Sequence, residues 1–234
     1  MRTKYAFIPE DTVKLENGKT VIRIKALIDL PAHEVKAGDL GGYIENEKNL
    51  SHYGECWVSE NAYVYDAALI GGAALIWGNS RVYDNALIHG YAYICGNSRV
   101  YGNAIILGKA HINEYALIHG NAQVYGDPII HGYAQIKDYA VICGYAIIND
   151  YAIICGSAQV KGHAQVDGNV CAYDNAIICG NARINDNAII CGDACAYGDA
   201  VIGGDTKVSG NTKVYGTPGS YRTAGVYADR PINK

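Results

Sequence analysis

The sequence contains seven histidines, the side chains best suited to proton transfer at neutral pH and common ligands of metal ions: His33, His52, His89, His111, His119, His131 and His163. We expect no catalytic residue among them. Three, His89, His119 and His131, each precede a glycine; they are expected to be solvated surface residues, with a general base as the alternative. A zinc site would need several ligands at a recurrent spacing. The sequence has no Cys-x-x-Cys pair and no cluster of His and Cys, so we expect no metal site.

Tyrosine and arginine recur at a fixed spacing of 18 residues. Aromatic rings in a row, flanked by guanidinium groups, could hold a planar or anionic ligand. They could equally stabilise one another, as cross-strand pairs do in any sheet. We therefore predict a ligand or partner strip, with the structural alternative left open, at Tyr65, Arg81, Tyr83, Arg99, Tyr101 and His119. The same two interpretations apply to Tyr115, Tyr133 and Tyr151.

These residues belong to a six-residue repeat that runs without insertion from Asn61 to Gly216, a span of 26 consecutive hexads. With Asn61 as position one, position two is Ala in 20 hexads and position four is Val or Ile in all but two. Position six is Gly in 19 hexads, Asp in six and Glu in one. Where position four shrinks to Ala172, position two grows to Val170, a volume exchange that a close-packed interior favours.

Each position has a physical reason. Positions two and four lie two residues apart, so their side chains point to one side of an extended chain and should form the core. Position three varies freely and should face outward. Gly tolerates a positive φ, and Asp and Asn tolerate it better than other residues, so positions six and one should form a corner.

A hexad is too short for a strand and turn of an ordinary sheet, because its extended part covers only about 10–13 Å. Three hexads per coil would give a triangular prism with 18 residues in each coil, and at least 28 hexads give about nine coils. The sequence therefore predicts an all-β solenoid of stacked parallel strands.

The repeat resembles that of the hexapeptide-repeat superfamily, in which Leu, Ile or Val is followed four residues later by a small residue. The segments ICGNAR, VYGNAI and IKDYAV fit this pattern. The resemblance implies a left-handed parallel β-helix. Acyltransferases of that superfamily bind an acyl donor such as acetyl-CoA between neighbouring prisms, typically with a histidine base and a loop that leaves the coil. Trimers are common among them.

The segment before the repeat resembles the entry segment of the YdcK-like family of hexapeptide-repeat proteins, whose transferase label is itself inferred from the superfamily. The matching features are the Val-Lys-Ala-Gly run at 35–38, Gly41-Gly42 followed by Tyr43-Ile44, Asn49-Leu50-Ser51, and Gly54-Glu55-Cys56-Trp57. With the repeat, the resemblance covers nearly the whole chain. It carries over no catalytic residue.

Two strand-like runs around Asn17-Gly18 predict a β-hairpin, because Asn-Gly is a strong turn signal. We expect residues 1–48 to cap an open end of the solenoid, because exposed coils would otherwise pair with other chains. Residues 49–216 should form the β-helix. The segment 217–234 departs from the repeat and should be a second cap, a strand along one side, or a tail.

Outward apolar residues in a row suggest a partner surface. The 18-residue register places Leu69, Leu87 and Ile105 in one column with Leu107 beside it, and Val141 and Ile177 on the same side. Gln123 and Gln159 interrupt this side. We expect this side to contact other copies in a homo-oligomer, for example a trimer, or to contact a protein partner.

Composition narrows the remaining classes. The formal net charge of −4 offers no basic footprint for DNA or RNA. No apolar run approaches the roughly 18 residues of a membrane span, and the first residues, MRTKYAFIPEDTVK, lack the apolar core of a secretory signal. The eight cysteines are spaced unfavourably for disulfides, so we expect reduced thiols in a cytoplasmic protein.

Three functions remain open. The unbroken repeat favours a rigid interaction or scaffold module that needs no cofactor. The first alternative is an acyltransferase-like enzyme with a site between subunits and an acyl donor such as acetyl-CoA. The second is a polymer-forming solenoid, as in bactofilin-like filaments, which the N-terminal cap disfavours because filaments need accessible ends.

Overall fold

A computed structural model describes residues 3–216 and 226–227 of the chain. It divides into two compact units, Met1–Gly120 (unit 1) and Asn121–Lys234 (unit 2). Most of the predicted C-terminal segment, 217–234, lies outside the described residues.

Unit 1 begins with an antiparallel hairpin of β1 (Tyr5–Lys14) and β2 (Thr20–Ala26). The strands form around Asn17-Gly18 as predicted, but the loop has three residues rather than two, because Leu15 and Lys19 still pair through their backbones at 2.8 Å. Gly18 closes the loop with a φ of 84°, which a residue with a Cβ rarely adopts. Two short 3₁₀ helices, η1 (Pro31–His33) and η2 (Glu47–Asn49), follow the hairpin.

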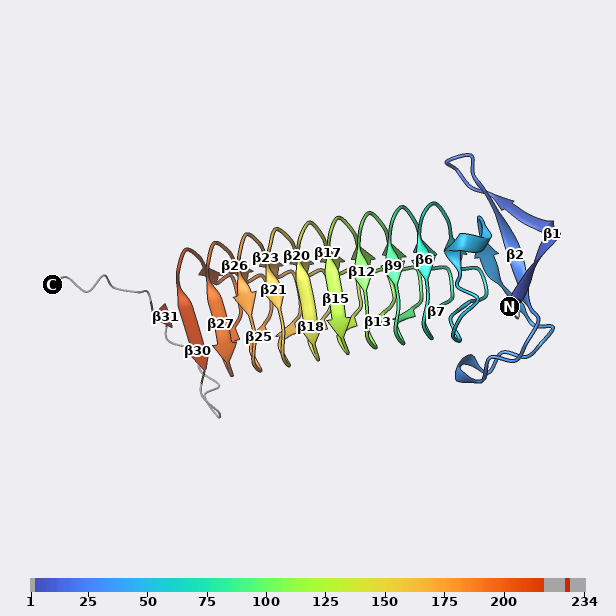
Figure 1. The fold of residues 1–234 in the computed structure, drawn as a ribbon. Coiled ribbons are helices and arrows are strands. Elements are labelled where there is room, and N and C mark those ends of the chain that lie inside the picture. Colours follow the sequence, from blue (N-terminus) through green and yellow to red (C-terminus); the bar gives the residue numbers. More distant parts are fainter. Residues whose placement is uncertain (1–2, 217–225, 228–234) are drawn as a thin grey trace. The chain divides into compact units, whose positions relative to one another are not determined.

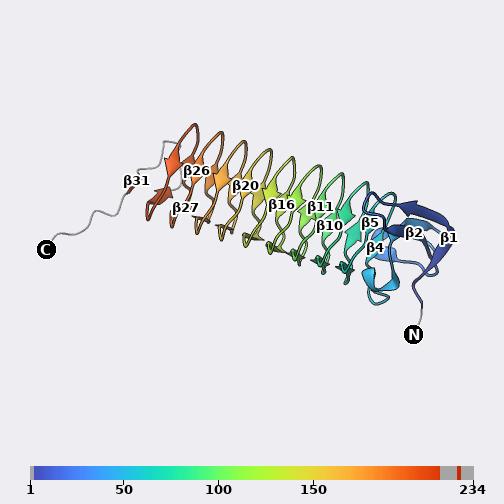
Figure 2. The same ribbon diagram turned by 90° about the horizontal axis from the view of Figure 1, so that it is seen from above.

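Three sheets make up unit 1, and the chain visits them in turn (Figure 1). The tyrosine side continues from β1 and β2 through β3 (Leu40–Ile44), β5 (Tyr63–Val64), β8 (Arg81–Val82), β11 (Arg99–Val100) and β14 (Leu117–Ile118). The tryptophan side contains β4 (Trp57–Val58), β7 (Leu75–Ile76), β10 (Tyr93–Ile94) and β13 (His111–Ile112). The leucine side contains β6 (Leu69–Ile70), β9 (Leu87–Ile88) and β12 (Ile105–Ile106). Figure 2 shows β1 and β2 at the same end of unit 1 as β5, with β3 between β2 and β5 in the sheet.

The strands of unit 2 also lie on three sides. One contains β17 (Gln135–Ile136), β20 (Ile153–Ile154), β23 (Cys171–Ala172), β26 (Ile189–Ile190) and β29 (Lys207–Val208). Another contains β16 (Ile129–Ile130), β19 (Ile147–Ile148), β22 (Gln165–Val166), β25 (Arg183–Ile184) and β28 (Val201–Ile202). The third contains β15 (Gln123–Gly126), β18 (Val141–Gly144), β21 (Gln159–Val160), β24 (Ile177–Ile178), β27 (Cys195–Gly198), β30 (Lys213–Gly216) and β31 (Val226–Tyr227).

The predicted register of 18 residues per coil is confirmed. Within unit 1, Tyr63 pairs with Arg81 in parallel strands, and within unit 2, Gln159 pairs with Ile177. The three stacked parallel sheets make each unit a β-solenoid. The left-handed sense of the coil remains a prediction from the superfamily resemblance.

Positions two and four form the core, as expected. All Val and Ile at position four and all Ala at position two are buried, whereas position three is half-buried or exposed. The exceptions at position two are also accommodated: Ser80 and Ser98 are fully buried, and their hydroxyls donate to the carbonyls of Trp77 and Cys95 at 2.8 and 2.7 Å. A small polar residue can therefore replace Ala because it satisfies its own hydroxyl locally.

The corners explain why position six accepts Asp as well as Gly. All seven non-glycine residues at position six have φ between 56° and 61°. Five of the six aspartates use a carboxylate oxygen to accept the backbone N–H of a glycine one coil later, as Asp174 does from Gly192 at 3.1 Å; the sixth, Asp66, accepts that of Asp84 at 3.2 Å. Aspartate adopts a positive φ less readily than glycine does, but its carboxylate adds a hydrogen bond between coils.

The exchange of volume between Val170 and Ala172, both fully buried, can be tested by a double-mutant cycle. We expect Ala172→Val alone to destabilise unit 2 by about 1–3 kcal/mol through overpacking, and Val170→Ala alone by about 2 kcal/mol through a cavity. The double variant restores the common hexad and should recover most of both losses. Urea-unfolding midpoints of the four proteins measure this. Additive losses in the double variant would show that the two side chains do not share one space.

Candidate functional site

The tyrosine side of unit 1 brings the predicted aromatic residues into one column. Tyr65, Tyr83, Tyr101 and His119 each follow a strand of this side at position five. Their ring centroids are 5.0, 4.9 and 4.7 Å apart in sequence order, and neighbouring ring planes differ by 1°, 1° and 5°. The rings therefore face one another, and a planar ligand could not stack between them.

The hairpin covers the start of this column. Tyr65 is only 7% exposed and belongs to an apolar cluster with Val21 and Tyr43. Partly buried Val13, Leu15, Tyr63 and Tyr83 pack against that cluster. Tyr65 thus anchors the hairpin and is not available to a ligand, whereas Tyr101 and His119 remain half-buried.

Burial raises the pKa of the phenols in this column above the usual value. It raises the pKa of Tyr83 to about 12, and it raises the pKa of Tyr65 and Tyr101 as well. All three hydroxyls are therefore neutral at physiological pH and can donate hydrogen bonds. Because the ring faces are stacked on one another, the column offers neutral hydroxyl groups to a ligand, not ring faces or negative charge.

Arg81 and Arg99 lie two residues before Tyr83 and Tyr101 and are register partners on neighbouring strands β8 and β11. Arg81 is half-buried, with its guanidinium carbon 5.6 Å from the ring centroid of Tyr63, and Arg99 is exposed. Among the described residues neither makes an ion pair. The residues of the predicted strip thus lie next to one another on one side of unit 1. Tyr65 among them packs under the hairpin.

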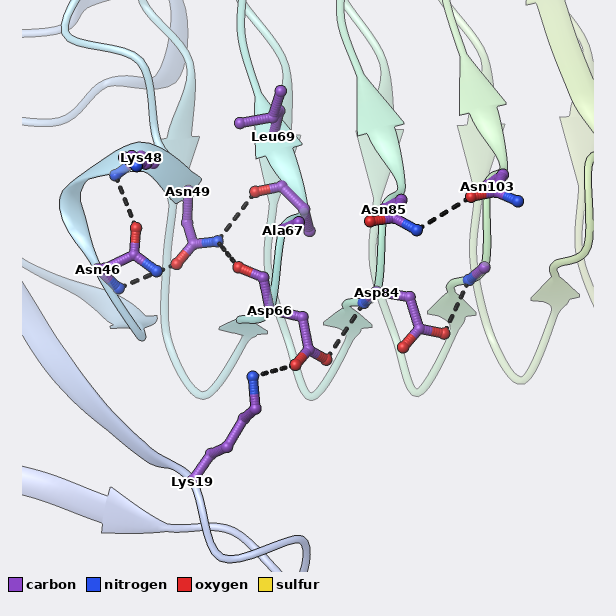
Figure 3. Close-up of a pocket in the computed structure, with 12 residues that line it drawn as sticks. Lys19, Asn46, Lys48, Asn49, Asp66, Ala67, Leu69, Asp84, Asn85 and Asn103 are labelled. Atoms are coloured by element: carbon purple, nitrogen blue, oxygen red, sulfur yellow. Dashed lines mark hydrogen bonds and ion pairs between the residues drawn. The ribbon is translucent and has the colours of Figure 1, made fainter.

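A polar cavity of about 860 Å³, the corner pocket, opens between the N-terminal segment and the coils of unit 1 (Figure 3). It is lined by Lys19, Asn46, Lys48, Asn49, Asp66, Ala67, Ala68, Leu69, Asp84, Asn85, Gly102 and Asn103. Its position at a corner was not predicted, because Lys19 reaches it from a hairpin that lies far away in the sequence.

Most charges of the corner pocket are already engaged. Lys19 pairs with Asp66 and, at 3.2 Å, with Glu45. The hydrogen bond to Asp66 raises the pKa of Lys19. Asp66 accepts the N–H of Asp84, and the amide of Asn49 donates to the carbonyl of Asp66 at 3.1 Å. These contacts fasten the N-terminal segment to the first coils, so the pocket is foremost a structural joint.

A second, more apolar cavity of about 510 Å³, the leucine groove, lies where η2 and the residues after it meet the leucine side. Its lining comprises Glu47, Lys48, Leu50, Ser51, His52, Tyr53, Leu69, Ile70, Gly71, Leu87 and His89. The exposed His89 lies over Gly71, because a Cβ on Gly71 would come within 2.7 Å of the His89 ring. Glycine at position 71 therefore makes room for His89, a catalytic candidate that lines this cavity.

The neighbouring His52 is committed to structure. Its Nε2 lies 2.8 Å from a carboxylate oxygen of Glu47, and its Nδ1 accepts the backbone N–H of Lys4 at 3.2 Å. Its ring stacks on Tyr5 at 4.5 Å. With both nitrogens engaged, the neutral imidazole has no lone pair available for a substrate proton.

The three histidine candidates are not brought together. His89 lies on the leucine side and His119 on the tyrosine side of unit 1. His131 follows β16 in unit 2 and lies near Asp167, whose carboxyl pKa is raised mainly by burial. No side of either unit therefore holds more than one of these three histidines.

The predicted oligomer face divides between the units. In unit 1, Leu69 and Leu87 are register partners, Leu87 pairs with Ile105, and Leu69 and Leu107 are 47% and 39% exposed. In unit 2, Val141 and Ile177 are half-buried and lie on either side of Gln159, as the sequence indicated. In unit 1 the apolar column Leu69–Leu87–Ile105 borders the leucine groove.

One buried pair was not predicted from the sequence. The amine of Lys4, which is fully buried, donates to the carbonyl oxygen of Cys56 at 2.7 Å and lies 3.1 Å from its sulfur. Burial lowers the pKa of Lys4 and raises that of Cys56. The two residues are 52 positions apart, so only the folded N-terminal segment reveals the contact.

The described part of the chain shows neither a disulfide nor a cluster of metal ligands. All eight cysteines are free thiols, two of them, Cys56 and Cys191, buried. No group of three or more His, Cys, Asp or Glu is placed to hold a metal ion within residues 3–216. In the same residues no helix is long and apolar enough to cross a membrane.

No protein-family model and no curated protein matches the chain. Among solved structures, the chain is similar to LpxA from Acinetobacter baumannii, with a TM-score of 0.34 and 18% identity over 80% of this chain and 69% of that one. It is also similar to a putative acetyltransferase from Bacillus cereus, with a TM-score of 0.24 and 16% identity over 76% of this chain and 80% of that one. Similarity at this level does not assign the chain to a family.

The stacked column predicts a stability effect that depends on the number of ring neighbours. Tyr83 has a ring on both sides, so Tyr83→Ala should lower the free energy of unfolding by about 2–3 kcal/mol through two lost ring pairs and lost burial. Tyr151 stacks on Tyr133 at 5.1 Å and is 59% exposed, so the control Tyr151→Ala should cost less than about 1 kcal/mol. Urea unfolding measures both. Equal losses would show that the column does not support the fold.

Proposed function

We propose that the chain is a rigid interaction module that assembles with further copies of itself through the leucine side of unit 1. The observation that carries this proposal is the apolar column Leu69–Leu87–Ile105, which borders the leucine groove and leaves Leu69 about half exposed. Exposed apolar residues that are contiguous with a groove favour a protein partner.

A second copy is the partner that this surface fits best. The leucine side presents its side chains at the spacing of the coils, about 4.8 Å. An identical column has the same repeat, so its side chains can fit between those of the first copy over the whole length of contact. Contact between identical surfaces is also the commonest way in which proteins form symmetric oligomers.

Other outward residues support a display role over a catalytic one. Tyr83 and Tyr101 stack within their column, and His52 has both nitrogens engaged. The Asp residues at the corners hold backbone N–H groups of the next coil. Side chains that could do chemistry are thus largely occupied in holding coils together. We place this module in the cytoplasm and assign it no cofactor.

One observation favours the acyltransferase-like alternative, whereas the YdcK-like relationship remains a prediction from the N-terminal segment. His89 is an exposed imidazole at an apolar groove, where a donor such as acetyl-CoA could lie between two copies. In that case millimolar acetyl-CoA should raise the unfolding temperature of the oligomer, and His89→Ala should abolish acyl transfer without changing assembly. An oligomer that acetyl-CoA does not stabilise would speak for the interaction module alone.

The polymer-forming alternative has less support. The hairpin strand β2 pairs with β3, and so occupies the edge at which the tyrosine side of unit 1 would otherwise accept another chain. Filaments need that edge to be accessible.

Assembly through the leucine side can be tested with one charge substitution. Leu87→Glu should dissociate the oligomer, because the interface would bury a carboxylate without a partner. The control Leu117→Glu changes an equally half-buried position three on the tyrosine side and should leave assembly intact. Sedimentation velocity measures the mass of each protein. A monomeric wild type, or an oligomer that survives Leu87→Glu, would overturn the proposal.

A further inference from the structure

The tyrosine side of unit 1 holds two positive charges next to each other. Arg81 and Arg99 are register partners on adjacent parallel strands. The residues before and after them in the same column, Tyr63 and Leu117, are uncharged. Like charges directly opposite each other destabilise a sheet, so the fold alone gives no reason for this pair.

Neither guanidinium has a carboxylate to neutralise it among the described residues, although other cations of unit 1 do. Arg23 in the hairpin donates to a carboxylate oxygen of Asp11 at 2.6 Å, and Lys19 pairs with Asp66. The nearby corner carboxylate of Asp84 accepts the N–H of Gly102 at 3.0 Å. The carboxylate of Asp84 is thus held at the corner by the backbone, and among the described residues it makes no ion pair with either arginine.

The groups that flank the pair add hydrogen-bond donors. Tyr83 and Tyr101 lie two residues further along the chain, just after the same strands, and a phenol is protonated at neutral pH and can donate a hydrogen bond. The ring of Tyr63 lies beside the Arg81 guanidinium and limits the positions that this side chain can take. Two guanidinium forks and two hydroxyls thus lie together with no acceptor assigned to them.

We propose that Arg81 and Arg99, with the hydroxyls of Tyr83 and Tyr101, bind a phosphate group carried by a small molecule. Each guanidinium can donate two parallel hydrogen bonds to oxygens of one anion. A phosphate monoester presents three terminal oxygens and close to two negative charges, so it can engage both forks, whereas a carboxylate has only two oxygens to share. Small molecules that carry a phosphate would thus be ligands of the proposed interaction module. This binding does not depend on assembly through the leucine side.

The test compares inorganic phosphate, pyrophosphate and sulfate with sodium chloride at equal ionic strength, using thermal unfolding and calorimetric titration of the full chain. Phosphate and pyrophosphate should raise the unfolding temperature of the wild type above the chloride control. Arg99→Gln should weaken phosphate binding about tenfold or more, while its own unfolding temperature without ligand stays the same or rises because a like-charge contact is gone.

The matched control is Arg183→Gln. Arg183 is an exposed arginine at position three of unit 2, with Gln165 and Val201 as its register partners and no second arginine beside it. Its loss should leave phosphate binding unchanged. The proposal is overturned if phosphate acts no more strongly than chloride, if Arg99→Gln binds phosphate as the wild type does, or if Arg183→Gln weakens binding equally. Equal affinity for sulfate would overturn the assignment to phosphate.

The same variants separate this proposal from the proposed function. Arg99→Gln should sediment as the wild type does, because the tyrosine side takes no part in leucine-side assembly. Failure of phosphate binding in an intact oligomer would reject the arginine site alone, and phosphate binding by a monomer would reject the assembly alone.

Discussion

Backbone hydrogen bonds between successive coils hold each unit together and determine everything its surface displays. The N–H of an outward residue donates to the carbonyl of an inward residue one coil later, as Leu75 does to Ala92 and Ile177 does to Ala194, both at 2.9 Å. These bonds repeat at every side and fix a register of 18 residues. In each hexad, positions two and four must fill the core and position six must form the corner. Only positions one, three and five can therefore vary.

This register converts spacing in the sequence into contact in space. Tyrosines that recur every 18 residues lie on neighbouring coils and contact one another. For this reason the rings of Tyr65, Tyr83 and Tyr101 face each other at about the distance between coils. The same rule forces Arg81 against Arg99, where it costs stability instead of adding to it. The stacked rings therefore have a structural reason, whereas the arginine pair has none and is the basis of the proposed phosphate site.

The repeat and the register could be predicted because they are local: the identities of positions two, four and six follow from burial and from positive φ. What the sequence could not supply is the placement of the N-terminal segment. Lys19 reaches Asp66, and the hairpin covers Tyr65, through contacts that no six-residue pattern encodes. The leucine groove and the Lys4–Cys56 contact depend on the same segment. For this reason the columns were predicted residue by residue, whereas the cavities beside them were not.

The register can be measured in solution from nuclear Overhauser effects between methyl groups of the core. We expect cross-peaks between core residues 18 positions apart, such as Val160 with Ile178 and Ile76 with Ile94, and none from the outward position-three side chains into this methyl network. Cross-peaks at any other regular separation, or contacts that place position three in the core, would contradict the coil and every surface column derived from it.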